Sequence, residues 1–199
     1  MRHRIARFFL LLTGLTLATP ASAQDGPTAV VQRLNDTLLG VMQEAESLGF
    51  AGRYDRLEPV LGQIFAFPTM ARVAAGSHWR GLSDEQRERL ADAFARFSIA
   101  TYANRFDGYF GEHFKTISEE ELKRGHRLVK TVLIKSNGEE IQLDYILHQK
   151  NEQWRIINVI AEGVSDLSLK RADYTSYLKK NGFDALLQKI TDKIKSYEG

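Results

Sequence analysis

The residues best suited to chemistry lie in the segment VIAEGVS, residues 159–165, which contains Glu162, Gly163 and Ser165. A serine nucleophile needs a neighbouring base, and no His lies nearby in the sequence. Gly163 permits a turn that other residues avoid, and Ser165 can cap a helix that begins after it. The sequence therefore favours a structural hinge at this corner over a catalytic one.

The other common catalytic and metal-binding patterns are missing from the sequence. It has no Cys, and it contains no HExxH motif, no GxSxG motif and no phosphate-binding Gly loop. Asp144 and His148 share one face of a predicted strand but stand about 13 Å apart, which is too far for a dyad. The other His residues of the mature chain, His78, His113 and His126, are not spaced as a pair of metal ligands. We expect no enzymatic activity, no metal and no cofactor.

The N-terminal residues 1–23 have the features of a secretory signal peptide: a basic start, a short apolar centre and the small-residue site ASA. This segment holds three of the 27 Lys and Arg residues and none of the 25 Asp and Glu residues, so the mature chain is close to neutral. Nucleic-acid binding needs a basic surplus, and we therefore expect no such partner. The sequence predicts a periplasmic protein with a single domain over residues 24–199.

Helical periodicity dominates the first half of the mature chain. It predicts an amphipathic helix over residues 27–48 that ends at Gly49, and short helices over 54–65 and 67–76. Ser83 begins a capping box, and the long helix after it should run to about Tyr109. Two more helices are expected over 167–181 and 183–197, separated by Gly182.

The long helix carries two apolar stripes. One contains Leu90, Phe94, Phe97 and Thr101, and the other contains Ile99, Tyr102, Phe106, Tyr109 and Phe110. Two stripes need two apolar neighbours. Either the helix is sandwiched in the core or broken near Asn104 or Gly108, or its second stripe faces an apolar ligand.

Residues 116–161 alternate with a period of two, which indicates antiparallel strands. Asn137 and Gly138 predict a two-residue hairpin turn, and a second turn is expected at residues 150–153. The first turn pairs Val132 with Leu143, Lys130 with Tyr145 and Leu128 with Leu147. The second turn pairs Leu147 with Ile156, Tyr145 with Asn158 and Leu143 with Ile160.

One polar row crosses the apolar face that this register creates, and it consists of Lys130, Tyr145 and Asn158. A lysine on an apolar face costs free energy unless its ammonium finds a partner or water. The three side chains either satisfy one another inside the core or mark the polar end of a buried ligand.

Two long segments resemble a known family. Residues 159–190, VIAEGVSDLSLKRADYTSYLKKNGFDALLQKI, resemble the C-terminal signature of the MlaC or toluene-tolerance family of periplasmic lipid carriers, and residues 82–114 resemble its long central helix. The stretches GFAGRYDRLEPV and FPTMARVAAGSHW are most similar to the hopanoid-associated branch, HpnM. The resemblance covers nearly the whole mature chain.

The resemblance implies an α+β fold in which helices close over one face of a curved antiparallel sheet, in a cone of the nuclear-transport-factor type, around an apolar cavity. It implies a phospholipid or hopanoid as cargo. The implied partners are an inner-membrane ABC transporter complex with its MCE-type component and an outer-membrane lipoprotein or transporter. It supplies no catalytic residues.

We therefore predict a lipid-binding shuttle whose pocket is lined from the long helix and the sheet. The predicted lining consists of Phe94, Phe97, Tyr102, Phe106, Tyr109, Phe110, Lys130, Val132, Leu143, Tyr145, Leu147 and Ile156. Two alternatives stay open at this point. One is a periplasmic enzyme that uses Asp144 or Glu162 as a base, and the other is an interaction adaptor without a ligand.

Overall fold

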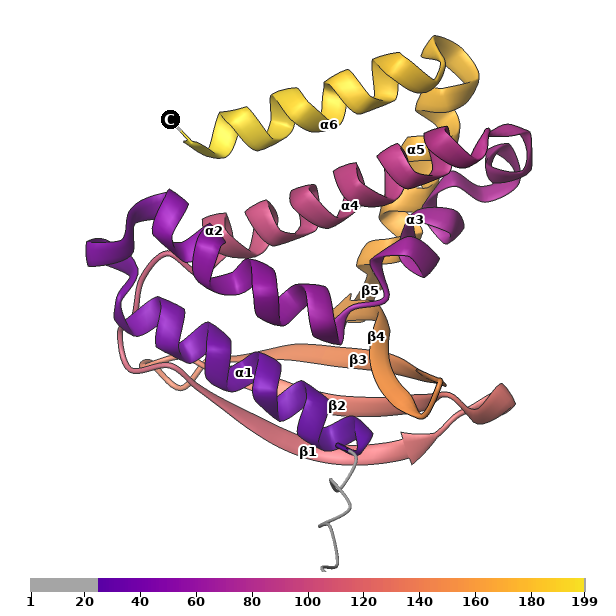
Figure 1. The fold of residues 1–199 in the computed structure, drawn as a ribbon. Coiled ribbons are helices and arrows are strands. Elements are labelled where there is room, and N and C mark those ends of the chain that lie inside the picture. The colour runs from indigo at the N-terminus through magenta and orange to yellow at the C-terminus, as the bar shows by residue number, and fades with distance from the viewer. Residues whose placement is uncertain (1–24, 199) are drawn as a thin grey trace, which may run out of the picture.

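The computed structural model describes residues 25–198, and the predicted signal peptide, residues 1–23, lies outside this range. The described chain is built from helices and strands in the order shown in Figure 1. The helices are α1 (Pro27–Gln43), α2 (Ala45–Ile64), α3 (Phe67–Ala75), α4 (Asp84–Arg105), α5 (Asp166–Asn181) and α6 (Phe183–Glu198), with the short 3₁₀ helices η1 (Gly76–Gly81) and η2 (Lys123–Gly125). The strands are β1 (His113–Glu121), β2 (Arg127–Ile134), β3 (Glu140–Lys150), β4 (Gln153–Ala161) and β5 (Val164–Ser165).

The strands form one antiparallel sheet in the order β1-β2-β3-β4-β5. Figure 1 shows the sheet curving beneath the helices, with α1 lying along it, α2 and α4 farther away, and α6 farthest from it. The hydrophobic core fills the space between these layers, and Leu34, Leu61, Phe94 and Leu147 are fully buried there. The predicted α+β fold, with helices over one face of a curved antiparallel sheet, is confirmed.

The first predicted helix is divided differently in the structure. Helix α1 ends at Gln43, not at residue 48, and its apolar stripe is buried as expected. Helix α2 begins at Ala45 and continues through Gly49, whose φ of 60° and ψ of −175° put a kink inside the helix. Only glycine adopts such a conformation easily. Gly49 therefore bends the chain, and the change of direction that lets α1 pack on the sheet lies earlier, at Glu44.

Helix α4 begins as predicted and ends earlier than predicted. The Ser83 side chain accepts a hydrogen bond from the Gln86 amide while the Gln86 side chain accepts one from the Ser83 amide, which completes the capping box. The helix ends at Arg105, so Tyr109 and Phe110 lie in the loop before β1 rather than on its second stripe. Helices α2 and α3 pack along α4 from one side and α6 from another. This arrangement supports the sandwiched interpretation of the two stripes.

The hairpin between β2 and β3 has a different turn from the one predicted. The Gly138 amide donates to the Lys135 carbonyl, and Gly138 has a φ of 84°, so the loop has three residues with glycine in the left-handed position. The register therefore slips by one residue, and Val129 now pairs with Tyr145. A slip of one residue turns every side chain of a strand to the other face. Strand β2 buries Val129 and Thr131 toward the helices, and the prediction for Lys130 and Val132 is wrong.

The hairpin between β3 and β4 follows the predicted register only near its turn. Leu147 pairs with Ile156 as expected. An irregularity between Ile146 and Leu147 then shifts the partners, so that Tyr145 pairs with Val159 instead of Asn158. Such a bulge inserts one residue and re-aims the side chains beyond it. The predicted polar row of Lys130, Tyr145 and Asn158 therefore does not exist.

The edge strand β1 is irregular as well. Its pairing with β2 shifts between Thr116 and Ser118, which leaves the side chain of Ile117 54% exposed. Glu120 near the end of the strand forms an ion pair with Lys130, at 2.7 Å between the carboxylate and the ammonium. Lys130 thus has a partner on the solvent side of the sheet, not in the core.

Candidate functional site

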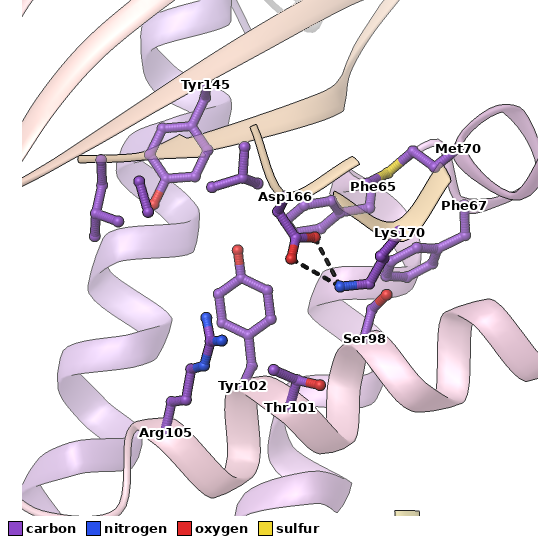
Figure 2. Close-up of a pocket in the computed structure, with 13 residues that line it drawn as sticks. Phe65, Phe67, Met70, Ser98, Thr101, Tyr102, Arg105, Tyr145, Asp166 and Lys170 are labelled. Carbon is purple, nitrogen blue, oxygen red and sulfur yellow. Dashed lines mark hydrogen bonds and ion pairs between the residues drawn. The ribbon is translucent and has the colours of Figure 1, made fainter. Parts of the chain in front are cut away.

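A pocket opens between the helices and the concave face of the sheet (Figure 2). Its cavity measures about 80 Å³. The lining residues are Phe65, Phe67, Met70, Ser98, Thr101, Tyr102, Arg105, Leu143, Tyr145, Val159, Ala161, Asp166 and Lys170. Aromatic and aliphatic side chains form most of this wall, and polar groups lie among them.

The junction between α2 and α3 supplies the aromatic end of the pocket. The chain crosses to the sheet here, where the Ala66 amide donates to the Ile156 carbonyl at 2.9 Å. Phe65 and Phe67 stack with their ring centroids 5.3 Å apart, and Phe65 also contacts Tyr102 of α4. Pro68 at the start of α3 fixes the direction of the chain at this junction. The rings are therefore held from three elements.

Helix α4 supplies the opposite wall through residues three or four positions apart. The hydroxyls of Ser98 and Thr101 donate to carbonyls one turn earlier in the helix, each at 2.8 Å. Tyr102 points its hydroxyl into the pocket, and Arg105 follows one turn later on the same side (Figure 2). Burial raises the pKa of Tyr102 well above its usual value, Tyr145 and Asp166 add to this effect, and Arg105 opposes it.

The sheet contributes Leu143 and Tyr145 from β3, and Val159 and Ala161 from β4. Tyr145 is only 1% exposed, and its ring descends from the sheet toward Tyr102 (Figure 2). Burial also raises the pKa of the Tyr145 hydroxyl, with Asp144 adding to the effect. Both tyrosines are therefore neutral at physiological pH.

The corner at residues 159–165 is a structural turn, as predicted. Glu162 and Gly163 have φ values of 49° and 76°, which suit a two-residue hairpin turn between β4 and β5. The Glu162 carboxylate accepts a hydrogen bond from the Gln142 amide. Ser165 caps α5 by accepting from the Ser168 amide and donates to Asn158. The polar atoms of this corner thus serve the turn and the cap.

The first turn of α5 closes the side of the pocket with an ion pair. The Lys170 ammonium lies 2.8 and 2.9 Å from the two carboxylate oxygens of Asp166, one helical turn away. It also lies 5.2 Å from the centre of the Phe97 ring, where a cation–π contact is favourable. Lys170 is therefore neutralised by its own helix and held by an aromatic ring.

Three of the twelve predicted site residues line the pocket: Tyr102, Leu143 and Tyr145. Others that face the interior lie in the packed core outside the pocket lining: Phe94, Leu147 and Ile156 are buried, Phe106 stacks on Tyr102, and Phe97 stacks on Tyr197. Helical spacing identified apolar positions correctly but could not separate a packed ring from one that faces a cavity.

The remaining four predicted site residues lie away from the pocket. Lys130 and Val132 are on the opposite face of the sheet because of the one-residue slip in register. Tyr109 is 41% exposed and Phe110 is 78% exposed, because α4 ends before them. These four assignments to the pocket lining are corrected by the structure.

Several lining residues were not predicted, and three of them carried a signal in the sequence. Arg105 lies three residues after Tyr102, so the two share one face of the helix. Asp166 and Lys170 have the spacing of a helical ion pair. Phe65 and Phe67 reach the pocket through the bridge to Ile156, a long-range contact that local spacing does not reveal.

The groups suggested for an enzyme lie outside the pocket. Asp144 accepts a hydrogen bond from the Gln142 side chain at 2.7 Å and does not line the cavity. The rings of His126 and His148 meet edge to face with their centroids 5.1 Å apart, near the end of the sheet where β2 begins. Within residues 25–198, no group of three or more His, Asp or Glu side chains could hold a metal ion. The same residues include no helix long and apolar enough to cross a membrane.

A second depression, which we call the α2–α6 groove, is larger and more open. It measures about 660 Å³ and is lined by Leu48, Gly49, Phe50, Ala51, Tyr54, Asp55, Glu58, Arg96, Ile194 and Glu198. Tyr54 hydrogen-bonds with Glu58 at 3.4 Å along its own helix. Charged side chains at the edge of the groove face solvent.

Comparisons with known proteins agree with this architecture. The phospholipid-binding protein from Ralstonia solanacearum, solved in complex with a phospholipid, superposes with a TM-score of 0.75 at 16% sequence identity, over 86% of this chain and 98% of that one. At this identity the likeness concerns the fold.

Relatives in sequence point to one family. The intermembrane phospholipid transport system binding protein MlaC of Haemophilus influenzae is 25% identical over 90% of this chain and 87% of the relative. The toluene tolerance protein of Pseudomonas putida is 25% identical over 88% of this chain and 82% of the relative. The family model of the MlaC protein matches residues 32–192, most of the described structure. On this match, the chain belongs to the MlaC family.

Proposed function

We propose that this protein is a periplasmic carrier that holds a phospholipid in the pocket between its helices and its sheet. The observation that carries the proposal is an apolar cavity, walled by Phe65, Phe67, Leu143 and Val159, whose rim bears charged groups. Such a wall suits hydrocarbon, and such a rim suits a polar head. The names of the relatives, which refer to phospholipid binding and transport, support the same cargo.

The energetics explain why a lipid needs such a protein. Each methylene that leaves an apolar environment for water costs about 0.8 kcal/mol, so a lipid with roughly thirty methylenes faces about 24 kcal/mol in water. A protein wall that replaces the membrane interior removes most of this cost. We infer that loading occurs at one membrane and release at another, through an inner-membrane ABC transporter complex with an MCE-type component and an outer-membrane lipoprotein or transporter.

The pocket must widen to accept its cargo. A cavity of about 80 Å³ is far smaller than the roughly 300–1,000 Å³ typical of ligand sites. Its two walls meet mainly through apolar side chains, and the hydrogen bond from the Ala66 amide to the Ile156 carbonyl is a point where the helices stay joined to the sheet. The contacts of Tyr102 with Phe65 and Phe106 lie on the helical side and can move as one unit. We infer that the helices and the sheet separate when lipid enters.

Native mass spectrometry of the mature protein from a periplasmic extract tests the proposal. We expect about one phospholipid per chain, identified after organic extraction. A hopanoid in place of the phospholipid would assign the protein to the hopanoid-associated branch instead. A protein that carries no lipid, and acquires none from vesicles, would contradict the carrier and favour an interaction adaptor.

A further inference from the structure

The polar groups that line the pocket fall into two sets, and the first set is satisfied by the protein itself. Ser98 and Thr101 donate to carbonyls of their own helix. Asp166 and Lys170 neutralise each other. Each of these four side chains therefore already has a partner within the protein.

The second set consists of Tyr102, Tyr145 and Arg105. Within residues 25–198, neither tyrosine hydroxyl forms a hydrogen bond, and the Arg105 guanidinium has neither a hydrogen bond nor an ion pair. Figure 2 shows the two hydroxyls directed into the space between helix and sheet, with the guanidinium beside Tyr102. Tyr145 is almost fully buried, whereas Arg105 is exposed at the mouth. The pocket therefore has an inner pair of hydroxyls and an outer cation.

All three groups can donate hydrogen bonds, and Arg105 can only donate. Burial raises the pKa of both tyrosines, so both hydroxyls keep their protons at physiological pH. The two hydroxyls face the cavity and have no protein acceptor in the described chain, so a ligand that supplies acceptors there gains their hydrogen bonds. These donors are complementary to a ligand that places two hydrogen-bond acceptors beside the tyrosine hydroxyls and an anionic group beside Arg105 at the mouth of the pocket.

We propose, resting on the phospholipid-carrier function, that these groups recognise the ester-linked glycerol backbone of a glycerophospholipid. Tyr102 and Tyr145 donate hydrogen bonds to the ester carbonyl oxygens, and Arg105 pairs with the phosphate. Ester carbonyls and phosphate offer acceptors without competing donors. The arrangement favours a diacyl glycerophospholipid over an ether-linked lipid or a hopanoid, because neither of these presents a pair of ester carbonyls beside a phosphate.

The test compares two phosphatidylglycerols that differ only in their chain linkage, one diacyl and one dialkyl ether. Binding to the mature protein is measured by competition in native mass spectrometry. We expect the wild-type protein to prefer the diacyl lipid by about five- to 150-fold, the range for two neutral hydrogen bonds. The Tyr102→Phe, Tyr145→Phe double variant should bind the two lipids equally, because it lacks both hydroxyls.

Tyr54→Phe is the matched control. It also removes a tyrosine hydroxyl, but from the α2–α6 groove, where that hydroxyl already donates to Glu58. The control should keep the full preference for the diacyl lipid. Since Tyr102 and Tyr145 donate to no protein group in the described chain, their phenylalanine variants should fold. Circular dichroism of the double variant and of the single variant Tyr102→Phe checks that both are folded.

Arg105→Gln separates the outer contact from the inner ones. It should weaken both lipids by the same factor, about three- to tenfold at low salt, because both carry the phosphate. A wild-type protein that binds the two lipids equally would overturn the recognition of esters while leaving the carrier intact. Failure of every variant and of the wild type to bind either lipid would contradict the carrier function itself.

Discussion

The pocket and the α2–α6 groove differ both in volume and in whether their polar side chains have partners, and volume alone would select the wrong one as the binding site. The groove is about eight times larger, at about 660 Å³ against about 80 Å³. Its polar side chains reach solvent, and its tyrosine is paired with Glu58. The pocket instead encloses tyrosine hydroxyls that lack a partner in the described chain, within a wall of rings and aliphatic groups. Donors that face an apolar cavity without a protein partner indicate a ligand better than open volume does.

The largest expected effect comes from placing a charge in each of the two depressions. Leu143→Glu puts a carboxylate on the apolar sheet wall of the pocket, so lipid retention should fall by more than about 100-fold. Ala51→Glu adds the same charge at an exposed position of the groove and should leave retention unchanged. Native mass spectrometry of both variants measures this. The reverse result would move the lipid site to the groove.

A second prediction concerns an unpaired polar group that lines neither depression. Asn35 of α1 is completely buried, and neither atom of its amide has a hydrogen-bond partner in the described structure. Asn35→Leu should raise the free energy of unfolding by about 1–3 kcal/mol, because it removes an unsatisfied buried group. Urea unfolding measures the gain.

Lipid retention of Asn35→Leu gives the corresponding functional control. It should equal that of the wild type, because Asn35 does not line the pocket. A loss of lipid in this stabilised variant would show that Asn35 takes part in binding. The distinction between a polar group buried away from the pocket, such as Asn35, and one that lines the pocket would then be wrong.

A third prediction compares the tyrosines of the two depressions at alkaline pH. A buried tyrosine with a raised pKa stays protonated while the unfolded chain ionises above about pH 10, so stability falls as the pH rises, by about 1.4 kcal/mol per pH unit. Tyr145→Phe should remove the part of this loss that Tyr145 causes, because burial raises the pKa of Tyr145 strongly, while Tyr102 and Tyr174 keep contributing. Tyr54→Phe should remove a smaller part, because Tyr54 is only partly buried and its pKa is less affected.

Urea unfolding at pH 9 and pH 11 checks this comparison. The stability of the wild-type protein should drop between the two values, and the drop should be smallest in Tyr145→Phe. An equal drop in both variants would mean that the pocket shields its hydroxyl no better than the groove does.

The smallest expected effect is at Lys130. This residue pairs with Glu120 on the solvent face, and both side chains are substantially exposed. Lys130→Ala should therefore leave lipid retention unchanged and behave as an ordinary surface substitution in thermal unfolding. A clear loss of lipid would support the register expected from a two-residue turn, in which Lys130 faces the pocket.

Local signals predicted the helices well. The capping box at Ser83 and the glycine after α5 mark helix boundaries that the structure reproduces. These signals depend on hydrogen bonds between neighbours in the sequence, so the sequence contains all that is needed. The end of α4 was missed because aromatic residues continue the helical spacing for one more turn after Arg105.

The pocket was predicted only in part, since it depends on distant contacts. The β3 side of the sheet was correct, and Leu143 and Tyr145 line the cavity. The turn at Gly138 has one residue more than predicted, so the side chains of β2 were assigned to the wrong faces of the sheet. The alternation of residue types cannot detect this error, because both faces of β2 carry apolar residues. The bridge between Phe65 and Ile156 brings in the aromatic end, and it joins residues far apart in the sequence.

The irregular edge of the sheet has a consequence for the behaviour of the protein in concentrated solution. An open strand edge offers unpaired amides and carbonyls on which another chain can add a strand, the first step toward fibrils. The shift at Ile117 interrupts that ladder, and the carboxylates at the end of β1 repel a second copy. Separation of the layers, as proposed for lipid uptake, would expose apolar surface at each cycle. The irregular, charged edge of the sheet lowers the tendency of the protein to aggregate when this surface is exposed.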